Sequence, residues 1–380
     1  MPRKVFTAGE VLAASDVNTF LMNQAVMTFA GTAARGSAIG SATEGMVTYL
    51  ADTDTFQFFD GSSYQPFGVP LDISVDFLVI AGGGGGGGNI NFANNGSGGG
   101  GAGGYRTSFG TSGGGAAAES AYIVNPNKNY TVTVGAGGAG GVRNAPNPGV
   151  IGSDSLFAFI RSVGGGRGDT CATLTSFAGV GGNGGGGGGL AYSDNRGFAI
   201  VGQGSDGRGG FVNAPGAGGG GGGGGASARG GAPANPTGGT GGAGQASTIT
   251  GTSITRAGGG AGGHGLQSGG AGAAGGTGGG GQGGGTNNAV AGTVNTGGGG
   301  GGGAGSDANQ TYANGAAGGS GVVFLRYSNT LADLVVGSGL VIDNGSGGNV
   351  SGTGTRLTPS FSPTGAKVYM FKSGTGNVSW

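Results

Sequence analysis

The stretch VDFLVIAGGGGGGG (75–88) decides the fold of this chain, because a strand-like segment runs directly into an unbroken run of glycine. A second strand-like segment, GGSGVVFLRY (318–327), closes the glycine-rich region. Both are rich in β-branched and aromatic residues, which favour strands. We therefore expect the two strands to pair and to frame the region between them as one domain. The segments YIV (122–124) and YTVTV (130–134) are expected to join the sheet.

Glycine dominates the region between these strands. The chain has 109 Gly in 380 residues, and 91 of them lie between residues 82 and 320. A flexible linker is the simplest interpretation of such a composition, but a linker needs no particular run length. Here pure glycine runs recur at similar lengths, at 82–88, 184–189, 218–225 and 297–303.

Runs of similar length predict a regular element of extended, three-residue-per-turn helices, which rise about 3.1 Å per residue. Such helices have no internal hydrogen bonds, so their N–H and C=O groups must be satisfied by neighbours that only glycine allows to approach closely. We expect a polyglycine-II-like lattice, stabilised by backbone hydrogen bonds and almost without a conventional side-chain core.

Charge and cysteine content restrict the function classes. Sixteen Lys and Arg balance sixteen Asp and Glu, which gives no global field to attract nucleic acid or an anionic membrane. Cys171 is the single cysteine, so no intrachain disulfide forms. The start MPRKVFTAGEV has no apolar secretion-signal segment, and the apolar runs are too short to span a bilayer. We expect synthesis in a cytoplasm and no membrane insertion.

The N-terminal part is expected to form a helix and a β-meander. Ser15 is a good N-cap and Asp16 suits the positive end of a helix dipole, so a helix is predicted to begin near Asp16 and to run through SDVNTFLMNQAVMTFA (15–30). Its apolar stripe would need packing against neighbours or further copies of the chain. Residues 44–68 read as a β-meander of short strands broken by turns at Asp52–Asp54 and at Asp60-Gly61. The stripe comprises Val17, Phe20, Leu21, Gln24 and Met27 or Thr28.

Two resemblances cover most of the chain. FTAGEVLAASDVNTFLMNQAVMTFA (6–30) followed by EGMVTYLADTDTFQFFDGSSY (44–64) resembles the start of many phage tail-fibre and minor tail proteins, with Tyr64 where Trp is commoner. It implies a module that attaches a fibre or tip protein to a tail. The order VDFLVIAGGGGGGG, GAGGYR, YTVTVGAGGAGG and GGSGVVFLRY, over about residues 75–327, is similar to glycine-rich domains of phage tail fibres.

We therefore expect a mostly irregular and β chain with a tail-attachment module (1–70), a glycine-rich adhesin-like domain (71–327) and a small C-terminal β domain (328–380). In the last part, AKVYMFKSGTGNVSW (366–380) reads as a hairpin around Gly374, and Trp380 is expected to pack in it. The expected function is virion structure and host attachment: other tail proteins bind residues 1–70, a host surface glycan or protein is the receptor, and the chain forms a homotrimer. The alternatives are a purely structural spacer in the tail tip and a bacterial glycine-rich surface or ice-binding protein.

Receptor contacts are expected in the segments that interrupt the glycine runs. These segments are rich in Asn, Ser, Thr, Tyr and Phe, a composition that resembles that of antibody binding loops. An alternative for Phe92, Phe109, Phe198 and Phe211 is that they cap the lattice as a small apolar layer. The candidate receptor-binding residues are Asn91, Phe92, Asn94, Asn95, Tyr105, Phe109, Tyr192, Arg196, Phe198 and Tyr312.

The residues give little support for catalysis, a metal or a cofactor. His264 is the only histidine and is expected in an exposed loop, and its surroundings, GGHGLQS, resemble no nucleophile elbow. Asp52 and Asp54 are interpreted as turn formers. Cys171 and His264 are too few for a zinc site, and G-x-G-x-x-G matches carry no information in so glycine-rich a chain. We expect a protein that is not an enzyme.

Overall fold

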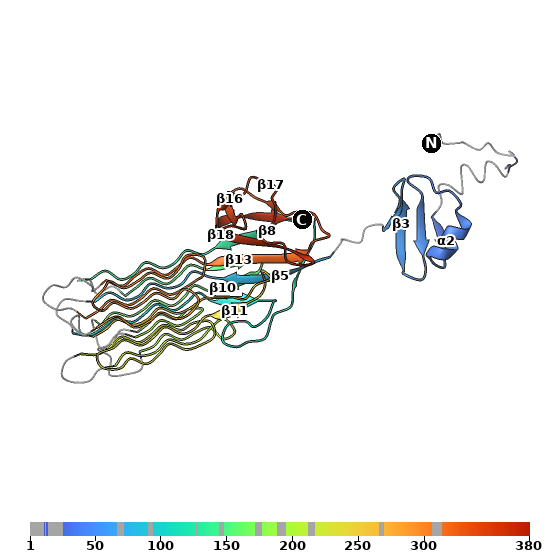
Figure 1. Cartoon of the computed structure of the whole chain (residues 1–380). Helices are drawn as coiled ribbons and strands as arrows, with labels where there is room; N and C mark the ends of the chain where they lie inside the picture. Colours follow the sequence, from blue (N-terminus) through green and yellow to red (C-terminus); the bar gives the residue numbers. More distant parts are fainter. Residues whose placement is uncertain are drawn as a thin grey trace. The chain divides into compact units, whose positions relative to one another are not determined.

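The computed structural model describes two compact units, Met1–Asp72 and Ile73–Trp380 (Figure 1). The described residues are Val11, Ala13, 26–66, 72–89, 94–126, 128–143, 148–171, 177–187, 195–211, 217–265, 270–305 and 314–380. Strands, extended glycine segments and one described helix make up these units, so the expected mostly β and irregular fold is confirmed. The units are described separately below.

The first unit is a four-stranded sheet in the order β1-β2-β3-β4, with one short helix. The expected meander is present as β2 (Val47–Leu50), β3 (Thr55–Phe59) and β4 (Tyr64–Pro66), paired antiparallel. Aromatic side chains pack between its strands: the ring centroids of Phe59 and Tyr64 lie 5.0 Å apart in an edge-to-face pair. Such pairs contribute about 0.5–1.5 kcal/mol beyond their buried area.

The predicted N-terminal helix is wrong at its C-terminal end. Met27–Phe29 form β1, which pairs in parallel with β2, while the helix α2 covers Thr32–Ala38. Residues 14–25, which carry most of the predicted helix and its apolar stripe, lie outside the described residues. The register Met27↔Thr48 shows the physical reason, because pairing with β2 satisfies backbone groups that a helix would have used internally.

Both predicted turns of the meander are present. Asp54 adopts a left-handed conformation with φ 53° in the β2–β3 turn, which Asp tolerates better than most residues. In the β3–β4 turn the Asp60 carboxylate accepts the backbone N–H groups of Ser62 and Ser63 at 2.9 and 2.8 Å. These bonds favour the charged form and lower the pKa of Asp60 to about 2.

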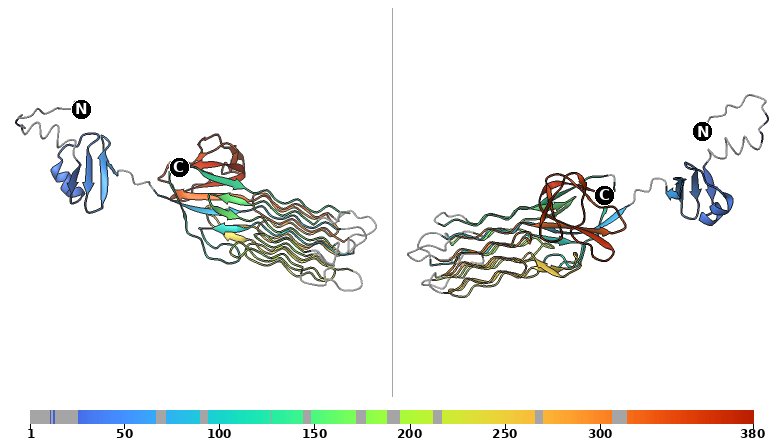
Figure 2. Two further views of the ribbon diagram at one scale, coloured as in Figure 1. Left: turned by 180° about the vertical axis from the view of Figure 1, so that it is seen from behind. Right: turned by 45° about the horizontal axis from the view of Figure 1, so that its top comes forward.

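The second unit begins with a strand sheet from which a glycine lattice extends (Figures 1 and 2). β5 (Ile73–Ile80) pairs antiparallel with β13 (Val322–Ser328), with Phe77 opposite Leu325, as predicted. The predicted strands β7 (Tyr122–Val124) and β8 (Tyr130–Val134) also belong to this unit, where β7 pairs with β5. The sheet runs in the order β10 (Ile160–Ser162), β9 (Ser155–Phe157), β8, β18 (Ala366–Ser379), β13, β5 and β6 (Tyr105–Thr107).

This sheet is nearly closed into a barrel. β9 (Ser155–Phe157) and β10 (Ile160–Ser162) form a hairpin at one end of the sheet order, and β6 (Tyr105–Thr107) lies at the other. The Ser162 hydroxyl donates to the carbonyl of Val79 at 2.7 Å, which brings β10 back to β5. One apolar cluster, which includes Phe77, Val132, Leu325, Tyr369 and Phe371, lies on one face, and a second, around Leu78, Tyr105 and Phe324, lies on the other.

Residues 328–380 are part of this sheet and do not form a separate unit. The expected hairpin is also wrong, because β18 is one strand from Ala366 to Ser379. Its first half pairs with β13 and its second half with β8, so residues after Gly374 satisfy their hydrogen bonds on a new neighbour without folding back. Two short strands, β14 (Val335–Val336) and β15 (Leu340–Asp343), pair with β18. β17 (Thr355–Arg356) pairs with β14, and β16 (Asn349–Ser351) pairs with β15.

Trp380 is buried, but it packs on residues of β8 and β13 and not within the predicted hairpin, which is absent. Its ring centroid lies 5.9 Å from that of Tyr130 and 5.8 Å from that of Tyr327, and it is 8% exposed.

The glycine runs form the expected lattice of extended segments. Along residues 82–87 the backbone N–H groups donate in rotation to three neighbours, and every third residue returns to the same one. Gly82 and Gly85, for example, donate to Ser153 and Val150 at 3.0 and 2.9 Å. The carbonyls of the same run accept from three further neighbours. Six segments therefore surround the run. Its N–H groups donate to carbonyls of segments 150–153, 316–319 and 98–101, and its carbonyls accept from N–H groups of segments 165–168, 138–141 and 300–303.

Six-sided packing explains where side chains are allowed. A segment with neighbours on all sides has no direction left for a Cβ: at Gly84 an ideal Cβ would lie 2.2 Å from the carbonyl oxygen of Gly166. In the outer segment 135–142, one residue in three faces solvent, and these positions are Ala136, Ala139 and Val142. Pure glycine therefore marks inner segments, and glycine interrupted every third residue marks outer ones.

Candidate functional site

The described residues among the ten predicted to contact a receptor lie in three separate places. Four of the ten, Asn91, Phe92, Tyr192 and Tyr312, lie outside the described residues. The other six fall into three places of the second unit: Tyr105 and Phe109 at the strand sheet, Asn94 and Asn95 at a segment end of the lattice, and Arg196 and Phe198 on an outer segment.

Tyr105 is in the core, so its prediction as a receptor contact is wrong. It is the first residue of β6, is 0% exposed and packs with Leu78, Phe324 and Val368. Burial raises the pKa of its hydroxyl to about 12, because the charged form would lose its hydration. The interruption of a glycine run by Tyr105 marks a strand that joins the sheet.

Asn94 and Asn95 have different roles. Asn94 is exposed, while Asn95 is 9% exposed and holds the end of the lattice together. The Asn95 side-chain oxygen accepts the N–H of Gly218 at 2.7 Å, and its carbonyl accepts from the Asn89 side chain at 2.8 Å. The side-chain oxygen and the backbone carbonyl of Asn95 therefore serve the lattice, while its role as a receptor contact stays a prediction.

Sequence reasoning missed a layer of buried polar side chains at this end of the lattice. Asn89 also donates to the carbonyl of Ala304 at 2.9 Å, and Asn195 donates to the Asp169 carboxylate at 3.1 Å. His264 belongs to the same layer; it is 2% exposed, so the expected exposed loop position is wrong. A signal was present in the sequence, because Asn89 directly follows the glycine run 82–88 and Asn95 lies just before Gly96-Ser97 and the run 98–101.

This polar layer replaces the lattice contacts where glycine segments end. The Cys171 sulfur is buried beside the Asn89 side-chain oxygen, and the carbonyl of His264 accepts from Gly305 at 2.7 Å. Buried polar groups cost free energy unless they are hydrogen-bonded, and here they bond one another and the last backbone groups. We infer that the layer fixes the positions at which the connecting loops leave the lattice.

Arg196 and Phe198 lie on the outer segment 195–200, which donates through Gly197 and Ile200 to Gly185 and Gly181. The Arg196 guanidinium lies 4.9 Å from the centroid of the Phe198 ring. Phe198 is 53% exposed, so it does not cap the lattice as a buried apolar layer. Phe211, at 43% exposed, does not either.

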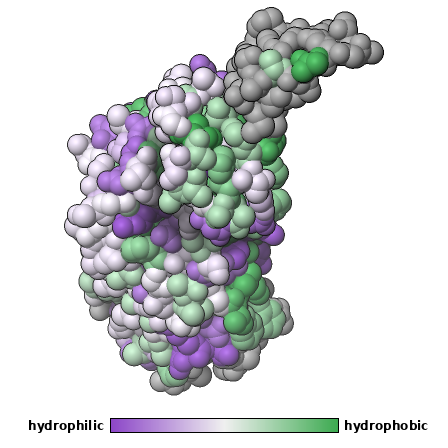
Figure 3. Space-filling model, turned by 90° about the vertical axis from the view of Figure 1, so that its right-hand side faces the viewer, coloured by the Kyte–Doolittle hydropathy of each residue, from purple (hydrophilic) through white to green (hydrophobic). Residues whose placement is uncertain are grey.

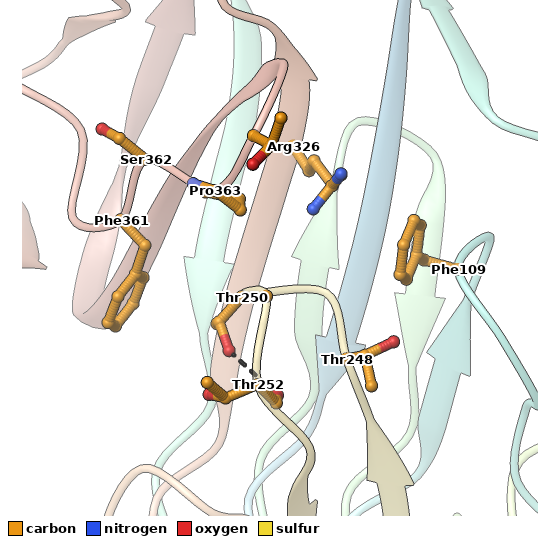
Figure 4. Close-up of a pocket in the computed structure, with 10 residues that line it drawn as sticks. Phe109, Thr248, Thr250, Thr252, Arg326, Phe361, Ser362 and Pro363 are labelled. Atoms are coloured by element: carbon orange, nitrogen blue, oxygen red, sulfur yellow. Dashed lines mark hydrogen bonds between the residues drawn. The ribbon is translucent and has the colours of Figure 1, made fainter.

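A cleft of about 640 Å³ lies beside the strand sheet (Figure 4). Phe109 and Phe361 stand on opposite sides of it, with the Arg326 guanidinium between them and the threonines of the β11–β12 turn below. β11 covers Gln245–Ser247 and β12 covers Ile254–Arg256. Arg326 lies 4.8 Å from the centroid of Phe109 and donates to the carbonyl of Ile249 at 3.0 Å, so Phe109 belongs to this cleft.

The surface shown in Figure 3 is pale overall, with apolar and hydrophilic residues in small groups. Its appearance follows from the composition, in which charged residues make up only 8%. Recognition on such a surface must rest on local clusters of side chains. In the described ranges, no group of three or more His, Cys, Asp or Glu side chains could hold a metal ion, and no helix is long and apolar enough to cross a membrane.

Residues 62–328 match the family described as a glycine-rich domain. The chain belongs to the glycine-rich domain family. The matched region ends at Ser328, the last residue of β13, although β18 completes the sheet of the same unit. No curated protein and no solved structure matches the chain.

Proposed function

We propose that this glycine-rich domain protein is a structural component of a bacteriophage tail, in a fibre or tail tip, and attaches the particle to the host cell surface. It would be made in the host cytoplasm and act at the cell exterior. The proposal is supported by the resemblance of residues 5–67 and 75–327 to phage tail proteins and by the family match of residues 62–328.

One geometric observation carries the proposal: the loop-bearing ends of the lattice segments are gathered together. Asn89, Asn95, Asn195 and His264 precede or follow the connecting segments. Asn89 bonds to Asn95, Asn195 bonds to Asp169, and the backbone of His264 bonds to Gly284 and Gly305. β5 enters the unit at Ile73, and the lattice begins after Ile80 and runs away from the sheet (Figure 1). A rigid scaffold that presents many loops at one end suits recognition, because the scaffold need not change when the loops do.

The test replaces residues 90–93 and 190–193 with Gly-Ser segments of equal length in the complete protein. We expect binding of the purified protein to host cells, and adsorption of particles that carry it, to fall about tenfold or more, as for removal of binding hot spots. Phe159→Ser is the matched control, since this residue is 89% exposed in the β9–β10 hairpin at the sheet. Unchanged adsorption and host range with the replaced segments would favour the alternative of a structural spacer.

We also propose that residues 1–70 contact other tail proteins and that the protein acts as a homotrimer. A trimer has three times the mass of the 35.2 kDa chain, which light scattering measures directly. A mass of 35.2 kDa at all concentrations tested would contradict the trimer without affecting the attachment role.

A further inference from the structure

Three arginine side chains gather on one lateral face of the lattice. Arg196, Arg208 and Arg229 come from three outer segments that hydrogen-bond side by side. Gly207 donates to the carbonyl of Gly197 at 3.1 Å, and Gly230 donates to the carbonyl of Asp206 at 3.1 Å. The backbone of this face is therefore held by the lattice before any ligand arrives.

Asp206 organises the arginines. Its carboxylate accepts the N–H of Ala199 at 2.9 Å and lies 3.5 Å from Arg196 Nε. Arg229 Nε donates to the carbonyl of Gly207 at 3.1 Å, next to Arg208. Partial burial and then the positive charges of Arg196 and Arg208 lower the pKa of Arg229, which is consistent with guanidinium groups close enough to repel one another. Three arginines against one carboxylate on these neighbouring segments leave an excess of positive charge.

Apolar side chains continue this face beside the arginines. Phe177 and Val180 are three residues apart on one segment, and Phe198 and Val201 are three apart on the next. Gly181 and Ala199 are paired in parallel, so the two segments are neighbours. A three-residue period returns side chains to the same side, and all four are exposed, at 62%, 61%, 53% and 97%.

We propose that this face binds an anionic polysaccharide, with sugar rings packed on Phe198 and carboxylate or phosphate groups bound by Arg208 and Arg229. Guanidinium groups bind planar oxyanions through paired hydrogen bonds, and aromatic faces suit the apolar faces of sugar rings. The lattice fixes the backbone, so binding costs little ordering of the main chain. The proposal rests on the attachment role and names the ligand class.

The test measures binding of the complete protein to polygalacturonate, to phosphorylated dextran and to unmodified dextran by calorimetry. We expect Arg208→Gln/Arg229→Gln to weaken binding to at least one of the two anionic polymers by about tenfold, as for loss of charge-assisted hydrogen bonds. Arg161→Gln/Arg356→Gln is the matched control, because it removes the same charge from two exposed arginines elsewhere on the unit. The two anionic polymers distinguish a carboxylate ligand from a phosphate ligand.

Two further readouts separate a site from nonspecific charge attraction. Phe198→Ala should weaken binding while Phe159→Ala should not, and raising the salt from ~0.02 M to ~0.5 M should weaken the parent more than the double variant. Equal binding of both double variants, or no binding of either anionic polymer by the parent, would overturn the inference. Cell attachment that survives the loss of polymer binding would leave the attachment role intact, whereas loss of cell attachment only on replacement of residues 90–93 and 190–193 would place recognition at the loops.

Discussion

An ideal Cβ on Gly222 would lie 1.9 Å from the carbonyl oxygen of Thr240 in the neighbouring lattice segment. The same construction on Gly300 gives 2.1 Å to the carbonyl oxygen of Ala316. Real Cβ atoms do not approach backbone oxygen so closely, so the neighbouring segment would have to move away. Movement of a lattice segment breaks hydrogen bonds on several sides at once.

We expect Gly222→Val and Gly300→Val each to destabilise the protein by several kcal/mol, about the sum of a few lost backbone hydrogen bonds and the strain of overpacking. Thermal melts followed by circular dichroism measure the effect. Ala139→Val is the control, because Ala139 is an exposed position of an outer segment, and Asn94→Ala should also leave the melting temperature unchanged. Val variants that melt like the parent would mean that these glycines are not packed.

Asn183 links two parts of the lattice through its side chain. Its amide nitrogen donates to the carbonyl of Gly103 at 2.9 Å and its oxygen accepts the N–H of Ser205 at 2.8 Å, with the residue 0% exposed. We expect Asn183→Leu, which is similar in size, to cost about 2–4 kcal/mol because two buried backbone groups lose their partners. Chemical denaturation measures the free energy of unfolding, and a loss close to zero would show that water satisfies both groups.

Alkaline pH should unfold the sheet through its buried tyrosines. Burial raises the pKa of Tyr105 from 10.0 to about 12 and also raises the pKa of Tyr327 and Tyr369. The folded state holds these protons more tightly than the unfolded state. The protonated tyrosines therefore contribute fully to the free energy of unfolding below pH 10, and the contribution of Tyr105 is lost as the pH rises through about 12.

Absorbance of tyrosinate and circular dichroism, recorded together, check this expectation. Tyrosinate from the buried rings should appear together with loss of β structure, and Tyr105→Phe should move the alkaline transition to higher pH. Titration of every tyrosine near its ordinary pKa in a protein that stays folded would contradict the buried position of Tyr105.

The C-terminal strand should be essential for the glycine-rich unit. β18 lies between β13 and β8 and places Tyr369 and Phe371, both 0% exposed, in the core. We expect removal of residues 366–380 to yield unfolded or insoluble protein, because two neighbouring strands lose their partner and two aromatic rings, each worth about 3–5 kcal/mol, leave the core. A soluble truncated protein with the parent's melting temperature would mean that residues 328–380 are an independent addition.

Local signals predicted the elements that depend on local chemistry. The β-branched and aromatic segments at 75–81 and 321–327 were expected to pair, and they do, because such side chains fill the two faces of a central pair. The Asp60-Gly61 turn follows from side-chain bonds within a few residues. The lattice was also predicted, since repeated pure glycine runs exclude a side-chain core and leave lateral backbone hydrogen bonding as the means of order.

Local sequence patterns did not predict which of the candidate receptor-binding residues are buried and which are exposed. Tyr105 and Asn95 interrupt glycine in the same way as Asn94 and Phe198 do, yet the first two are buried and the last two are exposed. What distinguishes them is the set of segments next to each residue, and those neighbours come from distant parts of the chain.

The sequence by itself determined that the glycine runs between residues 82 and 320 pack as backbone against backbone, because glycine offers nothing else to pack, and that flanking strands frame them. Only the tertiary structure decided which segment lies beside which, that β18 continues from β13 to β8 as one strand, and that the segments carrying Arg196, Arg208 and Arg229 lie side by side. The physical reason is that a glycine N–H is chemically the same in every segment. Its partner is therefore chosen by the packing of the whole unit.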